Sequence, residues 1–188
     1  MYYIKSIRKI ITILFVILIF ATCNNSTKET TDKVSQWMGD TLSLPKITKV
    51  LYNDSLLNCN FPLNEKANLK ITTLLWGDCH ACMEDLKKWD EFFQYSSSKK
   101  KIEMFFYLYT SNLHFFRENL YIQNIYKYPL IIDQDFNYID KNNIPLKDKT
   151  YQTFLLDSNN KVILVGNPIN NEKLKELYMQ EIGKRIRE

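Results

Sequence analysis

Acidic residues are missing from the start of the chain, and the rest of the chain carries almost no net charge. Residues 1–22 contain no Asp or Glu, whereas Lys5, Arg8 and Lys9 lie within the first nine positions. The net charge is +4 for the whole chain; without residues 1–22 it is 25 − 3 = 22 basic against 21 acidic residues, or +1. This near-neutral remainder excludes an electrostatic basis for binding nucleic acid, and no nucleic acid is expected as a partner.

The sequence also lacks internal repeats, low-complexity stretches and a long hydrophobic run. Its apolar run from Ile10 to Phe20 covers about half of the ~20 residues that a bilayer-spanning helix needs. A short apolar run after a basic start is typical of a signal peptide. The following Phe20-Ala21-Thr22-Cys23 resembles the lipobox of bacterial lipoproteins. We therefore predict a signal peptide over residues 1–22 and lipidation of Cys23.

The alternative is an uncleaved N-terminal anchor in which Cys23 has no role. Both interpretations place the rest of the chain outside the cytoplasm, where disulfides form. The predicted location is the cell envelope of a bacterium, on the periplasmic or outer-surface side, with a lipid anchor in the membrane. Residues 23–44 are mostly polar and lack a sustained hydrophobic period, which predicts a flexible tether. The one apolar pattern within residues 23–44 is formed by Val34, Trp37 and Met38, and it predicts a short helical turn.

Residues 45–188 have the hydrophobic patterning of one globular α/β domain. Buried strands with near-continuous apolar runs indicate a central mixed β-sheet, and amphipathic periods indicate flanking helices. The expected strands cover residues 47–51, 55–61, 69–76, 102–109, 129–132, 153–156 and 162–165. The expected helices cover residues 82–93, 113–121 and a last segment from Asn170 or Asn171 to about Gly183.

The motif Cys79-His80-Ala81-Cys82 lies where a predicted buried strand gives way to an amphipathic helix. Free backbone N–H groups and the positive end of the helix dipole favour a thiolate there and lower the pKa of Cys79. The two-residue spacing brings Cys82 within disulfide reach of Cys79. Cys82 is also on the apolar stripe of the helix, so Cys79 is the expected attacking thiol and Cys82 the resolving one.

The order strand, CxxC, helix, then βα, then hairpin and helix resembles the thioredoxin superfamily. The stretch Tyr151-Gln152-Thr153-Phe154-Leu155-Leu156-Asp157, followed by Asn159-Asn160-Lys161-Val162, resembles the family's strand-turn-strand after its active-site loop. The branch it most resembles is the thioredoxin-like lipoproteins of Gram-negative bacteria, which are related to the membrane-tethered TlpA-type oxidoreductases. The resemblance covers residues 60–183 and implies a thioredoxin-like fold. It also implies Cys79 as nucleophile, Cys82 as resolving cysteine, and protein thiols or disulfides as partners.

The resemblance implies that three residues near Cys79 tune the redox potential of the cysteine pair. It also identifies one position at which this chain differs from the family. His80 and Ala81 match the middle residues that set the redox poise; a protonated His80 favours the Cys79 thiolate, and Asp78 opposes it. The family places a cis-proline opposite the CxxC, where this chain has Tyr151. A cis bond before a non-proline residue costs roughly 3 kcal/mol, so that bond is expected to be trans.

These observations predict a membrane-tethered thiol–disulfide oxidoreductase, or a redox partner, that uses no cofactor. The missing proline supports one alternative, a catalytically inactive thioredoxin-like binding or envelope-accessory module. A metal-binding protein is a further alternative, but zinc usually takes four ligands. Cys79, Cys82 and His80 supply at most three, and His114 lies in a separate predicted helix, so no metal is expected. Cys59 is expected to be a buried free thiol.

Overall fold

The protein is described by a computed structural model covering residues 32, 34–53, 55–58, 67–95, 102–123 and 128–186. The predicted signal peptide, lipidated Cys23 and buried Cys59 lie outside these residues. The chain divides into a unit Met1–Trp37 and a compact unit Met38–Glu188. In the first, residues 34–37 are helical, as the sequence suggests. None of the helices in the described part of the chain is both long and apolar enough to cross a bilayer.

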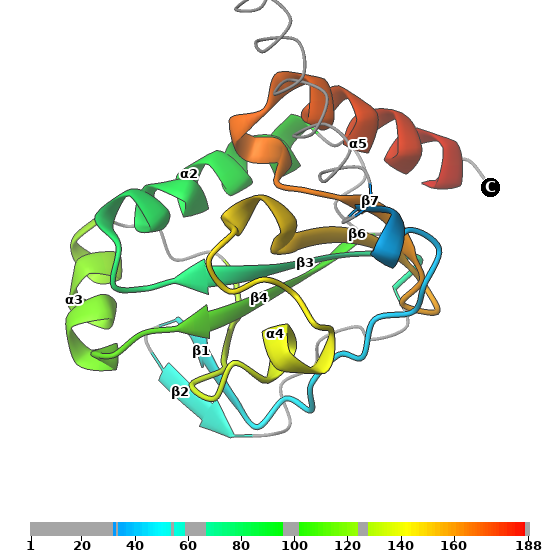
Figure 1. The fold of residues 1–188 in the computed structure, drawn as a ribbon. Coiled ribbons are helices and arrows are strands. Elements are labelled where there is room, and N and C mark those ends of the chain that lie inside the picture. The colour runs from blue at the N-terminus through cyan, green and yellow to red at the C-terminus, as the bar shows by residue number, and fades with distance from the viewer. Residues whose placement is uncertain are drawn as a thin grey trace, which may run out of the picture. The chain divides into compact units, whose positions relative to one another are not determined.

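The compact unit is built on a mixed sheet of seven strands in the order β2-β1-β5-β4-β3-β6-β7. The central strands β3, β4 and β5 are parallel to one another, and both sides of the sheet end in antiparallel strands (Figure 1). Their bounds are β1 Lys49–Tyr52, β2 Ser55–Asn58, β3 Leu69–Trp76, β4 Ile102–Tyr109, β5 Leu130–Ile132, β6 Thr153–Asp157 and β7 Val162–Val165. The predicted mixed α/β sheet is thereby confirmed.

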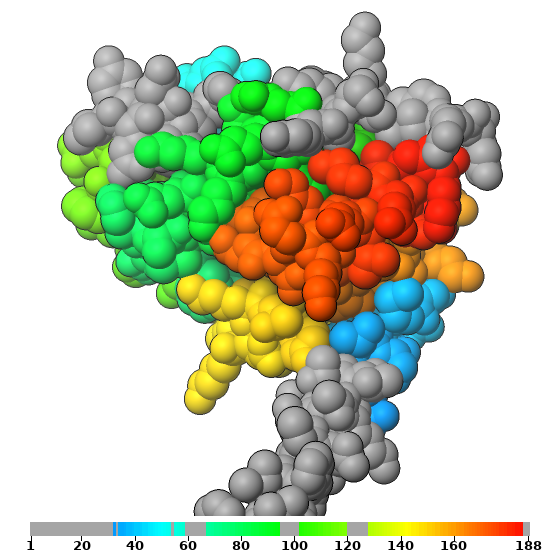
Figure 2. Space-filling model, turned by 90° about the horizontal axis from the view of Figure 1, so that it is seen from above, coloured from blue at the N-terminus to red at the C-terminus, as the bar shows by residue number. Residues whose placement is uncertain are grey.

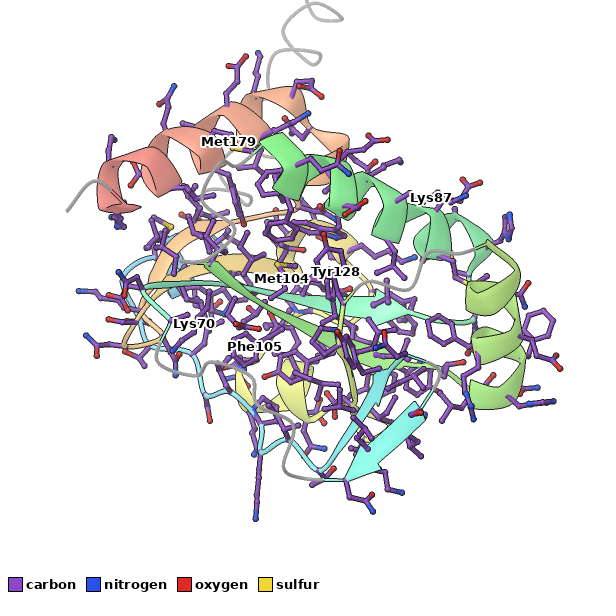
Figure 3. The ribbon with its side chains drawn as sticks, turned by 180° about the vertical axis from the view of Figure 1, so that it is seen from behind. Lys70, Lys87, Met104, Phe105, Tyr128 and Met179 are labelled. Atoms are coloured by element: carbon purple, nitrogen blue, oxygen red, sulfur yellow. A yellow bond between two sulfur atoms is a disulfide. The ribbon has the colours of Figure 1, made fainter. Side chains whose placement is uncertain are left out.

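Helices lie on both faces of this sheet. Figures 1 and 3 show α2 and α5 along one face and α4 on the other. The bounds are α2 His80–Tyr95, α3 Leu113–Gln123, α4 Asn137–Lys141 and α5 Glu172–Ile186, with short 3₁₀ turns η1 Lys149–Tyr151 and η2 Pro168–Asn170. Because β3 and β4 are covered on both sides, they carry almost unbroken apolar sequences, as central parallel strands do.

The main core lies between the sheet and α2, and aromatic side chains fill much of it. Trp89 of α2 packs against Phe92, Phe93 and Phe106 with ring centroids 5.5–6.2 Å apart. Tyr128, labelled in Figure 3, contacts the rings of Phe93 and Phe106 and donates a hydrogen bond to Asp90 at 2.9 Å. These contacts fix α2 on the sheet, and with it the position of the CxxC at its first turn.

The opposite face is covered by residues 133–152, a stretch for which the sequence predicts no element. Here the structure adds α4, which packs through Tyr138: its ring stacks on Tyr107 at 4.5 Å, and its hydroxyl is 2.9 Å from the Thr72 hydroxyl. The carboxylate of Asp133 accepts hydrogen bonds from the backbone N–H groups of Asn137 and Tyr138, which holds the first turn of α4. Five residues are too few for an amphipathic period to be read from the sequence.

The folded unit also begins earlier than residue 45. Gly39 and Leu42 donate backbone hydrogen bonds to the carbonyls of Val162 and Asn160, and Thr41 forms a bridge with Lys161. The last residues of the predicted tether therefore pair with the β6–β7 hairpin. Backbone groups make these bonds, so the polar side chains of the segment give no sign of them.

Candidate active site

The two cysteines of the CxxC are joined by a disulfide at the amino end of α2. Their Cα atoms are 5.1 Å apart. The carbonyl of Cys79 accepts hydrogen bonds from the backbone N–H groups of Cys82 (3.0 Å) and Met83 (3.2 Å), which places Cys79 at the helix cap. Cys79 is half-buried, whereas Cys82 is only 8% exposed. Cys79 is thus the more accessible of the two sulfurs, and its role as attacking thiol stays a prediction.

Gly77 sets the sharp change of direction between β3 and the disulfide. Its N–H donates to the Tyr109 carbonyl at 2.7 Å, which keeps the loop close to the end of β4. A Cβ at this position would lie 2.7 Å from the Thr110 Cβ and 2.8 Å from the ring of Phe116. A side chain larger than hydrogen does not fit there, and the loop can approach β4 only because residue 77 is glycine.

Asp78 faces the loop after β4. Its carboxylate accepts hydrogen bonds from the hydroxyl of Thr110 at 2.6 Å and from the backbone N–H of Ser111 at 2.9 Å. Burial by itself raises the pKa of Asp78, but these hydrogen bonds together outweigh it and hold the pKa below 3.8. Asp78 is thus a charged link between the two loops that frame the disulfide, in addition to the tuning role predicted for it.

The middle residues of the motif, His80 and Ala81, are both exposed. The His80 Nε2 atom is 4.0 Å from a Glu84 carboxylate oxygen one turn along α2. His80 is therefore at the outer surface of the helix start, where solvent can reach it. Its predicted influence on the Cys79 thiolate remains a prediction.

Tyr151, at the family's cis-proline position, ends the short turn η1. The peptide bond before it is trans, because no cis bond occurs in the described ranges. Its side chain is 6% exposed, and its N–H donates to the Asp148 carbonyl at 3.2 Å. The loop thus gains its shape from a hydrogen-bonded turn and a buried ring instead of from a proline.

Gln152 holds this loop in place, a role that the sequence did not suggest. Its amide nitrogen donates to the carbonyls of Pro145 (3.1 Å) and Leu146 (2.7 Å). Its amide oxygen accepts a hydrogen bond from the Trp76 indole at 3.2 Å. The side chain is almost fully buried and joins the loop before β6 to the end of β3. A single glutamine before a strand forms no sequence pattern from which this role could be predicted.

Lys149 is the second residue that sequence reasoning missed. Its Nζ atom lies 3.3 Å from the sulfur of Cys82 and 5.9 Å from the centre of the Trp76 ring. The lysine belongs to η1, 67 residues from Cys82 along the chain, and only the fold brings the two together. Figure 2 shows the start of α2 (blue-green), η2 (orange) and the yellow segment just before η1 on one surface of the molecule.

A pocket of about 330 Å³ opens beside Cys82 and Lys149. It is bounded by the ends of β3 and β6, by α2, and by the segment from η2 into α5. Its polar lining includes Asp85, Asn167, Asn170 and Asn171. Cys82 therefore borders an open pocket with both polar and apolar lining instead of a sealed core.

The structure offers the described cysteines and histidines no metal site. Within the described ranges, no group of three or more His, Cys, Asp and Glu side chains is arranged to hold a metal ion. His114 pairs with Glu118 on the exposed face of α3, at 3.3 Å. His114 is therefore placed at the surface of its own helix, as the sequence predicts.

Solved structures with the same arrangement of elements come from bacterial thiol–disulfide proteins. The thioredoxin domain of a thiol-disulfide oxidoreductase from Bacteroides vulgatus has a TM-score of 0.53 and 8% identity, over 74% of this chain and 96% of that chain. A thiol:disulfide interchange protein from Bacteroides sp. has a TM-score of 0.54 and 10% identity, over 78% and 91%. A Bacteroides thetaiotaomicron protein reaches 0.58 with 14% identity, over 80% and 91%.

The chain has a thioredoxin-like fold, and the fold prediction is confirmed. At these low identities the likeness establishes the fold alone. No family model matches the sequence, and no curated protein matches it. What the site does must therefore be argued from its own residues.

Proposed function

We propose that this chain is a thiol–disulfide oxidoreductase that exchanges disulfides through Cys79 and Cys82, tethered to a membrane outside the cytoplasm. The observation that carries the proposal is the disulfide between a half-buried and a buried cysteine at a helix amino end. The names of the structural neighbours, a thiol-disulfide oxidoreductase and a thiol:disulfide interchange protein, support the same chemistry. The signal-peptide pattern before Cys23 supports the location.

In the reducing direction the Cys79 thiolate attacks one sulfur of a substrate disulfide and releases the other as a thiolate. The Cys82 thiolate then attacks the Cys79 sulfur of the mixed disulfide. This step forms the Cys79–Cys82 bond, frees the second substrate thiolate, and completes a two-electron transfer from protein to substrate. The released thiolates take protons from water. Cys79 can begin the reaction because the helix end stabilises its thiolate and its sulfur is accessible.

The reduction of insulin disulfides, with a dithiol as electron donor, tests this proposal. The full-length chain should accelerate the reduction, and Cys79→Ser should abolish the acceleration. Cys82→Ser should stop turnover and leave a mixed disulfide trapped on Cys79, which mass spectrometry detects. Alkylation of Cys79 in the reduced protein should titrate with an apparent pKa below the ~8.5 of a free thiol. A wild-type chain without activity, and with an ordinary Cys79 titration, would contradict the proposal.

One observation favours a second candidate, the inactive binding or envelope-accessory module. The loop opposite the disulfide carries a buried Tyr151 and a trans peptide bond where the family resemblance implies a proline. A module of this kind would keep the Cys79–Cys82 disulfide oxidised in the presence of a dithiol donor and would show the same insulin reduction as Cys79→Ser. The insulin assay therefore separates the two candidates.

A further inference from the structure

Cys82 presents a physical problem for the proposed reaction. Its sulfur must become a thiolate to resolve the mixed disulfide, yet the residue is only 8% exposed. Burial in a protein disfavours a charged group and raises the pKa of a thiol. Without a compensating interaction, the resolving step would depend on a neutral thiol, which is a poor nucleophile.

The compensating interaction is present in the structure. We propose that Lys149 is a positioning residue for the exchange reaction: its ammonium group holds the Cys82 sulfur as a thiolate once the disulfide is reduced. The two atoms are already 3.3 Å apart in the oxidised protein. A positive charge this close favours the ionised form of a neighbouring acid and opposes the effect of burial. The inference rests on the proposed function, because it describes how the second step of that reaction is prepared.

The turn η1 positions the backbone of Lys149, an exposed residue whose side chain reaches the sulfur. The Asp148 carboxylate accepts a hydrogen bond from the Thr150 N–H at 3.2 Å and caps the turn. On the other side Gln152 ties the loop to the carbonyls of Pro145 and Leu146. The ammonium group also lies over the Trp76 ring, an arrangement that favours a cation. The loop that lacks the family's proline thus delivers a charge to the disulfide.

Few other charges face the Cys82 sulfur. Of the described side chains that line the pocket, only Lys149 and Asp85 are charged. Asp85 is one turn from Cys82 on α2, and its carboxylate accepts hydrogen bonds from Lys88 and Asn170, both at 3.3 Å. The segment from η2 into α5 contributes neutral asparagines and Leu174. Among the described side chains that line the pocket, Lys149 is therefore the one whose positive charge can stabilise a Cys82 thiolate.

The pocket completes the chemistry. When Cys82 ionises, its proton passes to water in the adjoining space, and the sulfur retains its electron pair for the attack on Cys79. The thiolate that leaves the substrate later takes a proton from solvent, so protons and electrons balance. Because Lys149 stabilises the reduced form, the structure assigns the disulfide a more oxidising potential than it would have without this lysine.

The test uses the reduced full-length chain in detergent, with Cys79→Ser so that Cys82 cannot be reoxidised by its partner. Alkylation of Cys82 by iodoacetamide is followed against pH, with the modified peptide identified by mass spectrometry. Lys149→Met should raise the apparent pKa of Cys82 by about one unit, which is a tenfold loss of thiolate at pH values below the wild-type pKa. Lys149→Arg should retain most of the effect, and Lys149→Gln provides a second neutral variant should methionine disturb folding. Lys147→Met is the matched control, because it removes an exposed lysine from the same loop.

The second readout is the reduction potential of the Cys79–Cys82 pair in chains that keep both cysteines. It is measured at a pH above the Cys82 pKa of both proteins, where the thiolate is fully formed. There a tenfold weaker stabilisation of the thiolate lowers the potential by about 30 mV in Lys149→Met. Unchanged Cys82 titration and potential in both neutral variants, or equal shifts in Lys147→Met, would overturn the inference. Neither readout requires turnover of a substrate. A chain inactive on insulin that still shows both shifts would refute the proposed function and uphold the role of Lys149.

Discussion

At the scale of single residues, the surroundings of the disulfide are held by side chains with two or three partners each. Asp78 links the loop before α2 to the loop after β4 through Thr110 and Ser111. Gln152 links the loop before β6 to Trp76. Such residues fix the distance between the sulfurs and their neighbours, because each hydrogen bond constrains a different segment of the chain.

Asp78→Asn should destabilise the protein at neutral pH by roughly 0.5–1.5 kcal/mol, because the exposed carboxylate makes hydrogen bonds that solvent partly screens. The pKa of Asp78 is lowered in the folded state, so its stabilising effect is complete above 3.8 and is lost as the pH falls through the lower folded value. Urea unfolding at several pH values should show the two proteins converging in acid. Asp135→Asn, at an exposed position, serves as the control. A constant difference at every pH would contradict the assignment.

At the scale of elements, the site is assembled where four of them end. β3 leads into the first turn of α2, the loop after β4 touches the same turn, and η1 approaches from the far half of the chain. The turn η1 owes its position to a buried Tyr151 ring, to the Tyr151 N–H bonded to Asp148, and to Gln152. A proline at position 151 would lose both the buried aromatic ring and the N–H that donates to Asp148.

Tyr151→Pro should therefore lower the free energy of unfolding by about 2–5 kcal/mol, because it removes a buried aromatic ring and a backbone donor together. Tyr151→Phe is the matched control; it keeps the ring and the N–H, so it should lose much less stability than Tyr151→Pro. Chemical denaturation measures both. A Tyr151→Pro protein as stable as wild type, with undiminished insulin reduction, would contradict this prediction. It would show that the loop accepts a proline at position 151 without loss of stability.

At the scale of the whole molecule, the thioredoxin-like unit begins at Met38, and the proposed tether and anchor precede it. The mixed sheet has helices on both faces, and the disulfide lies just after the carboxyl end of β3. The envelope location rests on residues 1–23, and lipidation is the step that distinguishes a lipoprotein from a protein with an uncleaved anchor.

Cys23→Ala separates these two interpretations in cells. If Cys23 is lipidated, the wild-type chain should incorporate labelled fatty acid and fractionate with membranes, and Cys23→Ala should lose the label. Cys59→Ala provides the control, because it removes a cysteine that lies outside the predicted lipobox. Equal labelling of wild type and Cys23→Ala would contradict lipidation. Membrane association that persists in Cys23→Ala without any label would favour the uncleaved anchor.

The sequence by itself determined the sheet, the main helices and the disulfide. β3 and β4 match their predicted bounds because long apolar runs leave a chain segment few alternatives to a buried strand. Cys79 and Cys82 are three residues apart, so local geometry alone brings them together at a helix start. These features depend on neighbours along the chain, and patterns in a single sequence record such neighbours.

The tertiary structure alone decided what surrounds the disulfide. The Lys149 ammonium is 67 residues from the Cys82 sulfur in sequence and 3.3 Å from it in space. Gln152 acts on Trp76, and Gly39 pairs with Val162, through contacts of the same long-range kind. No local periodicity encodes them, since each needs the sheet order to be in place before the partners meet. The cysteine pair can thus be predicted from the sequence, whereas only the fold places the Lys149 charge beside it.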